Sequence, residues 1–364
     1  MKVCFLIDDF SATGGIQRVL PIVANALSAS IEVHTVSMYD INNDHNRTLY
    51  NDQITFKVLM QGPKLYLKQC FKIARLLKDY IKQNAIDILI ATSEMLSPYC
   101  YLATLFTKTK FCVWTHCPAN LYSEALVQRP FKYLGLKTAD CTIALTPETE
   151  TDLKKLYHTS KVTTIPNPID PGLLKPVNYD SGSKRIMAVG RLSKQKNFAK
   201  LVEVAALVTA EHPDWHFDLY GDGELRGELT KLIAAEQLQD HLILKGNVSN
   251  VYDLYSRYAF LVMTSLYEGF PMVLLEALAN GLPLVAFDIK TGPNLLINDK
   301  ENGYLIKPFD SAAMAEKICE LIKNTELREK MSMSSVERIG EFNIDSIVQK
   351  WLTLFEDLLR KPHR

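Results

Sequence analysis

The sequence lacks several features that mark common protein classes. Lysine plus arginine and aspartate plus glutamate each number 41, so no excess of positive charge draws the chain to nucleic acid. The seven cysteines form no C-x-x-C pair, which fits a reducing cytoplasm. Residues 1–10 lack the pattern of a signal peptide, and no run approaches the roughly 18 apolar residues of a membrane span. We therefore expect a cytoplasmic protein without a nucleic-acid partner.

Two further absences concern cofactors. There is no G-x-G-x-x-G fingerprint, which disfavours a nicotinamide-dependent enzyme. There is also no Asp-x-Asp pair to hold a metal, and Pro213 breaks the helix that His212 and His216 would need for joint ligation. We predict no metal and no other cofactor. A bound nucleotide diphosphate would then be neutralised by cations and by a helix N-terminus.

Short β-branched runs alternate with longer helical patterns, as in parallel sheets covered by helices. A chain of 364 residues suits two such domains. The predicted strands are 2–8, 31–37, 54–59, 86–92, 110–116 and 141–146 in the first half, then 184–190, 216–221, 242–246, 259–265 and 283–287; helical patterns cover 15–28, 64–83 and 147–156. The predicted fold class is α/β, with two doubly wound, Rossmann-like domains.

The domain boundary is predicted from a segment rich in proline, glycine, serine and asparagine, which cannot sustain a helix or a central strand. We predict an N-terminal domain over 1–168, a linker over 169–183, a C-terminal domain over 184–343 and a C-terminal helix over 344–364. The apolar stripe of that helix needs a partner surface on either domain, and the N-terminal domain is our first choice. Sheets of this type bind ligands at the carboxyl ends of their strands, so two facing domains would enclose a cleft.

The most informative segment is SLYEGFPMVLLEALANGLPLVAFD, residues 265–288. An apolar strand precedes it, and a helix is predicted to begin near Met272. Backbone N–H groups at that helix start would suit a pyrophosphate, and Glu276, one turn inside, could accept hydrogen bonds from ribose hydroxyls. The alternative is that Glu268 is an ordinary turn residue and Glu276 a solvated helix residue.

Three other short segments carry candidate residues. Arg191 and Lys196 follow a predicted strand and could neutralise a diphosphate, although a basic surface loop is a common alternative. The pair Gly14–Gly15 would let the backbone approach a ligand closely, or would simply make a tight strand-to-helix turn. His116 lies at the carboxyl end of a predicted strand, where it would point into the cleft.

Together these elements resemble the retaining glycosyltransferases of family 4, which have the GT-B architecture. Six motifs match in order along nearly the whole chain: the glycine pair at 14–15, His116, IPNPID at 165–170, GRLSKQKN at 190–197, YGDGELR at 220–226 and EGFPMVLLEA at 268–277. The last contains the family's E-x7-E element, with Glu268 and Glu276 as its acids. One motif could arise by chance, whereas six in this order are specific.

The resemblance implies roles for individual residues. Arg191 and Lys196 would hold the donor diphosphate and stabilise its departure, which is often the largest catalytic contribution. Glu268 and His116 would contact the donor sugar. The implied catalytic residues are thus His116, Glu268, Arg191 and Lys196, and the remaining implied donor-binding residues are Gly15, Asn247, Val248, Gly269, Phe270, Pro271, Met272, Val273 and Glu276.

The implied reaction is transfer of a hexose or N-acetylhexosamine from a nucleotide diphosphate sugar, UDP-sugar first, with retention at the anomeric carbon. The implied acceptor is a glycan or lipid-linked oligosaccharide of surface polysaccharide or lipopolysaccharide synthesis. Two alternatives stay open: another GT-B enzyme, such as an inverting transferase or a nucleotide-sugar epimerase, and a non-catalytic nucleotide-sugar-binding protein. The chain departs from the family after residues 290–294, where Leu295–Leu296 replaces a common acidic residue.

A basic band on the predicted helix 64–83 bears on the acceptor. At helical spacing its members are Lys64, Lys68, Lys72, Arg75, Lys78 and Lys82, beside an apolar stripe of Leu67, Phe71, Ala74, Leu77 and Ile81. One interpretation is a solvated helix that covers the first sheet. The other is peripheral contact with the anionic inner face of the cytoplasmic membrane, which would bring the enzyme to a lipid-linked acceptor.

Overall fold

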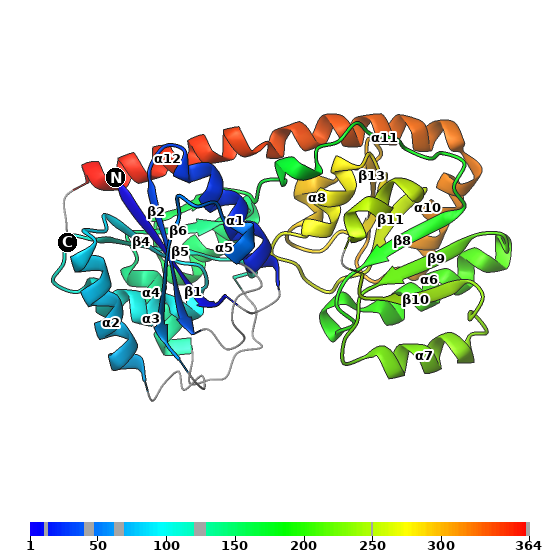
Figure 1. Ribbon diagram of the computed structural model, residues 1–364. Coiled ribbons are helices and arrows are strands. Elements are labelled where there is room, and N and C mark those ends of the chain that lie inside the picture. Colours follow the sequence, from blue (N-terminus) through cyan, green and yellow to red (C-terminus); the bar gives the residue numbers. More distant parts are fainter. Residues whose placement is uncertain (11–13, 40–46, 62–68, 120–128, 249, 362–364) are drawn as a thin grey trace. The chain divides into compact units, whose positions relative to one another are not determined.

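The structure is a computed structural model that describes residues 1–10, 14–39, 47–61, 69–119, 129–248 and 250–361. The chain divides into two compact units: Met1–Pro168 with Ile344–Arg364, and Ile169–Asn343. Each unit is built on one parallel sheet (Figure 1).

The first unit contains a seven-stranded sheet in the order β3-β2-β1-β4-β5-β6-β7. Its strands are β1 (Lys2–Asp9), β2 (Glu32–Tyr39), β3 (Thr55–Met60), β4 (Ile88–Ala91), β5 (Lys110–Trp114), β6 (Cys141–Ala144) and β7 (Val162–Thr164). Its helices are α1 (Gly15–Ser28), α2 (Cys70–Gln83), α3 (Ser97–Thr104), α4 (Arg129–Thr138), α5 (Pro147–Tyr157) and α12 (Ile344–Arg360). The strand order reverses between β1 and β4, which makes that point a candidate ligand-binding edge.

The second unit repeats this plan with six parallel strands in the order β10-β9-β8-β11-β12-β13. The strands are β8 (Arg185–Val189), β9 (His216–Tyr220), β10 (Leu242–Gly246), β11 (Phe260–Met263), β12 (Leu284–Phe287) and β13 (Gly303–Ile306). The helices are α6 (Phe198–Glu211), α7 (Arg226–Ala235), α8 (Met272–Ala279), α9 (Pro293–Leu296), α10 (Ser311–Lys323) and α11 (Thr325–Ile339). The order reverses between β8 and β11.

Two strands escape the sequence patterns. β7 has three residues, too few for a periodicity to register. β13 begins with Gly303, and a Cβ there would lie 2.0 Å from the carbonyl oxygen of Leu284 on β12. Glycine is therefore needed for β13 to approach its neighbour, although the same residue weakens the strand signal.

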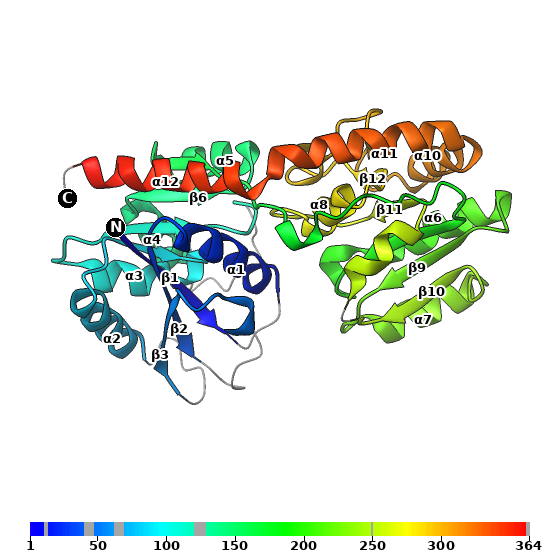
Figure 2. The same cartoon turned by 45° about the horizontal axis from the view of Figure 1, so that its top comes forward.

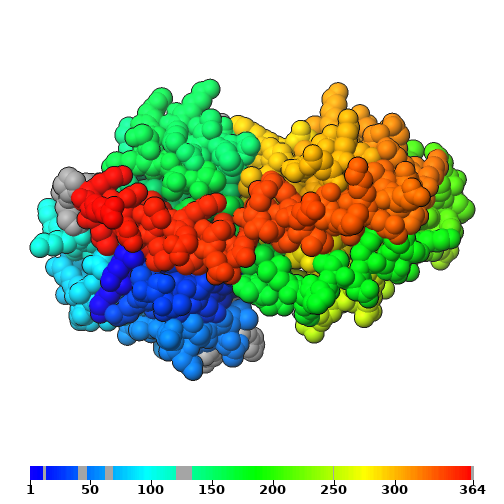
Figure 3. Space-filling model, turned by 90° about the horizontal axis from the view of Figure 1, so that it is seen from above, coloured from blue at the N-terminus to red at the C-terminus, as the bar shows by residue number. Residues whose placement is uncertain are grey.

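The C-terminal helix α12 packs within the first unit. Trp351 is fully buried, with its ring centroid 6.1 Å from Phe5 on β1 and 5.1 Å from Trp114 on β5. The helix also contacts α1, and Figure 3 shows the red residues of α12 against the blue N-terminal residues. Figures 1 and 2 place α1 and α12 on one face of the sheet and α2, α3 and α4 on the other.

The segment predicted as a linker is attached to the second unit. The Tyr179 hydroxyl donates to the carbonyl of Ala259 at 2.6 Å, and Arg328 Nη2 donates to the carbonyl of Ser181 at 2.7 Å. Apart from a short 3-10 turn over Pro171–Leu173, residues 169–183 contain no helix or strand. The segment thus keeps an irregular backbone while side chains fix it to the unit that follows.

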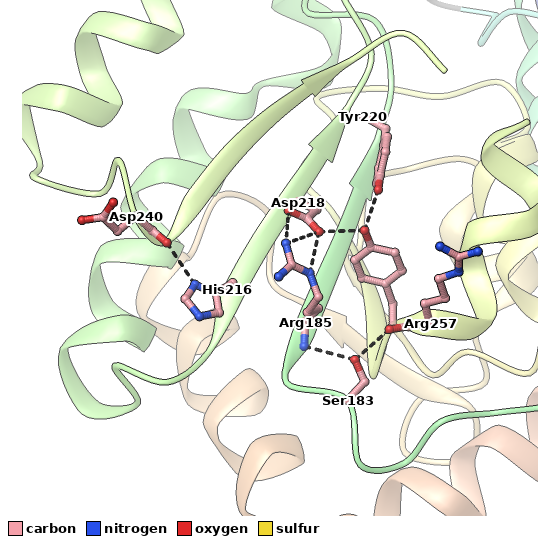
Figure 4. Close-up of polar contacts among 8 residues, drawn as sticks. Ser183, Arg185, His216, Asp218, Tyr220, Asp240 and Arg257 are labelled. Carbon is pink, nitrogen blue, oxygen red and sulfur yellow. Dashed lines mark hydrogen bonds and ion pairs between the residues drawn. The ribbon is translucent and has the colours of Figure 1, made fainter. Parts of the chain in front are cut away.

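A polar cluster around the buried Asp218 joins β8 to β9 in the second unit (Figure 4). Arg185 binds Asp218 through two hydrogen bonds, from Nε at 2.7 Å and from Nη2 at 2.6 Å. The Tyr258 hydroxyl lies 2.7 Å from the same carboxylate and 2.7 Å from the Tyr220 hydroxyl. Asp218 raises the pKa of Arg185 by hydrogen bonding, and burial raises the pKa of Tyr258. These contacts satisfy a carboxylate that is otherwise enclosed by apolar core.

Candidate functional site

An ion pair between Lys196 and Glu268 lies beyond the carboxyl ends of β8 and β11. Lys196 ends a short 3-10 turn after β8, and Glu268 lies in the loop after β11. Lys196 Nζ is 2.6 Å from Glu268 Oε1, and the two side chains are only 16% and 8% exposed. Because β8 and β11 flank the point where the strand order reverses, this pair lies where doubly wound sheets bind ligands.

Two further side chains hold the Glu268 carboxylate. Ser265 Oγ donates to Oε1 at 2.7 Å. Gln195 Nε2 lies 3.4 Å from Oε2 and donates to the carbonyl of Tyr267 at 3.1 Å. The sequence patterns did not single out Ser265 and Gln195, although both lie inside the selected segments. Hydroxyl and amide side chains are common in loops, and only the fold shows that these two converge on one acid.

Backbone contacts bind the two loops together. The Leu266 N–H donates to the carbonyl of Gln195 at 2.8 Å, and Thr264 Oγ1 donates to the carbonyl of Lys196 at 3.0 Å. The positions of Lys196 and Glu268 are therefore fixed by main chain as well as by side chains. Such rigidity is what a preorganised charged site requires.

A third loop, after β12, supports Glu268 from behind. Thr291 Oγ1 donates to the backbone carbonyl of Glu268 at 2.5 Å. Gly292 has φ of +103°, and a Cβ there would lie 2.7 Å from Pro271 Cδ. This packing needs glycine for both conformation and space. In the segment where the chain departs from the family pattern, Leu296 is fully buried, so it serves packing.

Arg191 is placed differently from Lys196. Its side chain is 75% exposed, and its guanidinium lies 3.2 Å from Glu224 in the loop after β9. Glycines bring these strand ends together: a Cβ at Gly221 would lie 1.9 Å from the carbonyl oxygen of Gly190. The two predicted phosphate-binding cations thus follow the same strand but have separate carboxylate partners. Lys196 is not the exposed basic loop residue of the alternative interpretation.

The helix α8 begins at Met272, as predicted, and no side chain caps its N-terminus. Gly269 and Phe270 form the turn before it, and the buried Phe270 ring contacts Phe342 at 5.9 Å between centroids. Pro271 is the N-cap, so Met272 and Val273 present their N–H groups in the first turn. The partial positive charge of this helix end would favour an anion.

Glu276 is buried inside α8 and exposes only 1% of its surface. The Tyr255 hydroxyl donates to its Oε2 at 2.9 Å. The interpretation of Glu276 as a solvated helix residue is therefore wrong. Its ribose-binding role stays a prediction.

The remaining residues of the predicted donor site are exposed. Asn247 and Val248 follow β10, and 39% of Val248 is exposed. Gly15 begins α1 in the first unit, and a Cβ there would meet no atom within 4 Å. Neither Gly14 nor Gly15 has a φ in the left-handed region. Open space is thus a feature of Gly15 alone, because a Cβ at Gly14 would lie 3.0 Å from Gln17 Oε1.

His116 lies in the first unit, two residues after β5. Its ring centroid is 4.4 Å from that of Trp114, and its Nε2 is enclosed without a hydrogen-bond partner among the described residues. Burial lowers the pKa of His116 to about 3, so the ring is neutral near pH 7. Thr115, its neighbour, donates to the buried carboxylate of Glu94. A neutral imidazole with an unsatisfied nitrogen is suited to a hydrogen bond with a ligand.

The described part of the basic band is on α2. Lys72, Arg75 and Lys82 are exposed and Lys78 is partly buried, whereas Lys64 and Lys68 lie outside the described residues. Phe71, predicted within the apolar stripe, is 81% exposed, while Ala74, Leu77 and Ile81 are buried. In the described parts of the chain, no helix is long and apolar enough to cross a bilayer.

The chain matches two family models. Residues 13–173 match the model described as Glycosyltransferase Family 4, and residues 173–337 match the one described as Glycosyl transferases group 1. The matches meet near the boundary between the two units.

Two curated relatives span almost the full length. An uncharacterized glycosyltransferase of Haemophilus influenzae is 29% identical, covering 96% of this chain and 98% of its own. An α-1,4-N-acetyl-D-galactosaminyltransferase of Campylobacter jejuni, named for the acceptor GalNAc-α-(1→4)-GalNAc-α-(1→3)-diNAcBac-PP-undecaprenol, is 26% identical and covers 98% of this chain and 99% of its own.

Among solved structures, HepE from Anabaena in complex with UDP superposes with a TM-score of 0.83. It is 18% identical, and the match covers 98% of this chain and 100% of that one. At this identity the likeness concerns the fold, which agrees with the two doubly wound sheets. The chain therefore belongs to the family 4 glycosyltransferases, has the GT-B fold and is a glycosyltransferase.

Proposed function

We propose that the protein transfers a hexose or N-acetylhexosamine from a UDP-sugar to a glycan or lipid-linked oligosaccharide, with retention, in the synthesis of a surface polysaccharide such as lipopolysaccharide. The observation that carries the proposal is the enclosed Lys196–Glu268 pair beside the uncapped start of α8. The pair joins a cation for a leaving diphosphate to a carboxylate for sugar hydroxyls. The UDP complex of HepE and the acceptor named for the Campylobacter jejuni relative support the two substrates.

In the proposed reaction, the bond between the anomeric carbon and the β-phosphate oxygen breaks, and its electrons stay with the phosphate. Lys196, Arg191 and the first amides of α8 stabilise this charge. The acceptor hydroxyl attacks the anomeric carbon from the same face, and its proton passes to the departing phosphate. Glu268 and the neutral His116 hold the sugar, and Glu276 holds the ribose. Gly15 leaves room for the diphosphate, and the backbone at Asn247 and Val248 contacts the base.

No metal is assigned to this step. In the part of the chain that the structure describes, the group with metal-ligand spacing is Glu211, His212 and Cys319. That group lies at the end of α6 opposite to Lys196. The diphosphate is instead neutralised by the two cations and the helix terminus.

A donor screen tests the nucleotide. UDP at about 100 times its Kd should stabilise the fold by about 2.7 kcal/mol, whereas GDP at the same concentration should shift the melting temperature little. Arg191→Ala should reduce the UDP shift, and Lys194→Ala, an exposed cation of the same loop, serves as the matched control. A larger shift with GDP would overturn the UDP assignment.

The product anomer tests the stereochemistry. With the donor identified, NMR of the transferred sugar should show the anomeric configuration of the donor. An inverted product would point to an inverting transferase, and a change in the sugar without transfer would point to an epimerase. Binding without turnover against a broad acceptor panel would favour a non-catalytic binding protein.

We also propose that α2 contacts the anionic inner face of the cytoplasmic membrane. Phe71, Arg75, Lys78 and Lys82 are spaced by four, three and four residues, so they share one face of the helix. Phe106, 95% exposed, adds a second aromatic beside this face, since Lys78 Nζ lies 5.7 Å from its ring centroid. Exposed aromatics among cations are typical of proteins bound at a bilayer surface.

Vesicle binding tests this contact. Each cation near an anionic surface contributes about 1 kcal/mol, so Lys72→Glu with Arg75→Glu and Lys82→Glu should reduce binding to phosphatidylglycerol vesicles by more than 100-fold. Phe71→Ser with Phe106→Ser should weaken binding at any salt concentration. Lys231→Glu, an exposed cation on α7, is the control. Transfer to a water-soluble acceptor analogue should persist, and absence of vesicle binding by the unmodified protein at low salt would refute the contact.

A further inference from the structure

Three residues with different metal-binding atoms meet where α6 ends. Glu211 is the last residue of α6, His212 is its C-cap, and Cys319 lies on α10. Their ligand atoms, a carboxylate oxygen, an imidazole nitrogen and a thiol sulfur, all lie within 4.8 Å of one another. The proposed reaction uses none of these three residues.

In the described part of the chain, the His212 side chain has an unpaired ring nitrogen. Its Nε2 is enclosed and has no hydrogen-bond partner among the described residues. Enclosed polar atoms in proteins are nearly always paired, so this nitrogen is available to a metal ion or to a water molecule. Cys319 is also buried, with 7% of its surface exposed, whereas Glu211 is open to solvent. The cluster can thus be reached from one side.

The local field favours a cation. Ser311, which begins α10, donates to Glu203 in the middle of α6, and Lys323, which ends α10, pairs with Glu211. The two helices therefore run in the same direction, and their C-terminal ends converge on this cluster. A helix C-terminus carries partial negative charge, so two together stabilise a positive ion.

The site is also accessible. A cavity of about 510 Å³ lies beside it, lined by Glu211, Cys319, Lys323 and neighbouring side chains of α6 and α10. The competing contact is the pair between Lys323 and Glu211 at 3.3 Å, with 61% and 62% of the side chains exposed. Pairs this exposed contribute little, so a metal could displace the lysine.

We propose that Glu211, His212 and Cys319 bind Zn²⁺, with water as the fourth ligand. Zinc accepts oxygen, nitrogen and sulfur together in a tetrahedral arrangement. Ligand atoms around tetrahedral zinc are about 3.5 Å apart, so small rotations of these side chains would complete the site. Burial raises the pKa of the Cys319 thiol, and binding has to displace its proton.

The proposed zinc site is remote from the donor site. The helix α6 begins at Phe198, two residues after Lys196, and its 14 residues span about 20 Å. The cluster thus lies near the amino ends of the strands, whereas the donor site lies at their carboxyl ends. Zinc would connect α6 to α10 and stabilise the second unit without taking part in transfer.

Metal binding to the chelator-treated protein is the test. Co²⁺ should produce the absorption of a cobalt–thiolate bond, and Zn²⁺ should bleach it at one equivalent. Cys319→Ser should abolish this band, and Glu211→Gln and His212→Ala should each raise the Kd for Zn²⁺ at least about tenfold. Cys117→Ser, which removes an exposed cysteine of the first unit, should change neither.

Stability and turnover distinguish a structural zinc site from adventitious metal binding at the thiol alone. Zn²⁺ should raise the melting temperature of the unmodified protein and of Cys117→Ser. At the same Zn²⁺ concentration it should raise that of Glu211→Gln less, and this exposed substitution is one that the fold should tolerate. Sugar transfer should be the same with and without zinc. A thiolate band that survives in Cys319→Ser, or equal Zn²⁺ affinity in Glu211→Gln and the unmodified protein, would overturn the site.

Discussion

Arg191 and Lys196 share one proposed role, but replacing them should reduce the stability of the protein by very different amounts. The Arg191–Glu224 pair is 75% and 53% exposed, so Arg191→Ala should cost at most about 1 kcal/mol of stability. Lys196 is 16% exposed and pairs with a carboxylate that is 8% exposed. Among the described residues, removing it leaves the enclosed Glu268 carboxylate with Ser265 and Gln195 as donors, so Lys196→Met should cost about 3 kcal/mol.

Catalysis should respond alike in both variants. Loss of one group that stabilises a leaving diphosphate costs about 2–4 kcal/mol, which lowers kcat about 30- to 1,000-fold. The double variant Lys196→Met with Glu268→Gln should recover most of the lost stability, because no unpaired charge remains, and should stay inactive. This result would show that the loss of stability comes from breaking the Lys196–Glu268 pair, and that the loss of activity comes from removing the Lys196 cation.

Hydrogen exchange of amides in β8 and β11 measures the opening free energy of the second unit, independently of the first. Transfer is measured with the identified donor. Near-normal turnover in Arg191→Ala would remove that residue from the mechanism. A Lys196→Met protein as stable as the original would show that Glu268 does not depend on the cation, and the electrostatic reasoning would fail.

Three other outcomes are expected. Transfer should persist in excess EDTA; loss that manganese or magnesium restores would contradict the proposed cationic neutralisation. Arg185→Met should destabilise the second unit by about 3 kcal/mol, because it leaves the carboxylate of Asp218, which is 1% exposed, without its cation. Asp218→Asn should cost less, because the Arg185 side chain is 43% exposed and stays hydrated; equal losses would contradict this difference. Burial lowers the pKa of His116 from 6.5 to about 3, so below pH 6.5 the unfolded state takes up a proton that the folded state does not, and the protein loses stability as the pH falls toward 3. The free energy of unfolding, measured with urea, should therefore decrease by about 2 kcal/mol between pH 7 and pH 5. His116→Gln should remove this decrease.

The architecture was predictable because both sheets repeat one pattern. Strands such as β4, β11 and β12 are buried along their whole length and appear as short apolar runs between helical segments. α1 begins and ends where the sequence pattern does, at residues 15 and 28. The patterns failed where a strand is three residues long, as β7 is, or begins with glycine, as β13 does.

The site was only partly predictable, because its geometry depends on contacts between distant segments. Glu268 was found from its motif, but its dependence on Gln195 and Ser265 arises from the adjacency of β8 and β11. Burial does not follow residue type at two of the predicted positions. Glu276 is enclosed although it is charged, and Phe71 is exposed although it is aromatic. In each case the surrounding elements, not the residue type, decide exposure.

The pairing of both cations has a consequence for binding. With Lys196 on Glu268 and Arg191 on Glu224, these four groups carry no net charge, so simple anions gain little from the resting site. Arg191 can leave its exposed partner at small cost, and Lys196 has further N–H groups for a phosphate. Both cations then interact most strongly when negative charge develops on the leaving group. Interactions that strengthen in the transition state raise kcat rather than merely tightening donor binding, and this arrangement directs the two cations to that step.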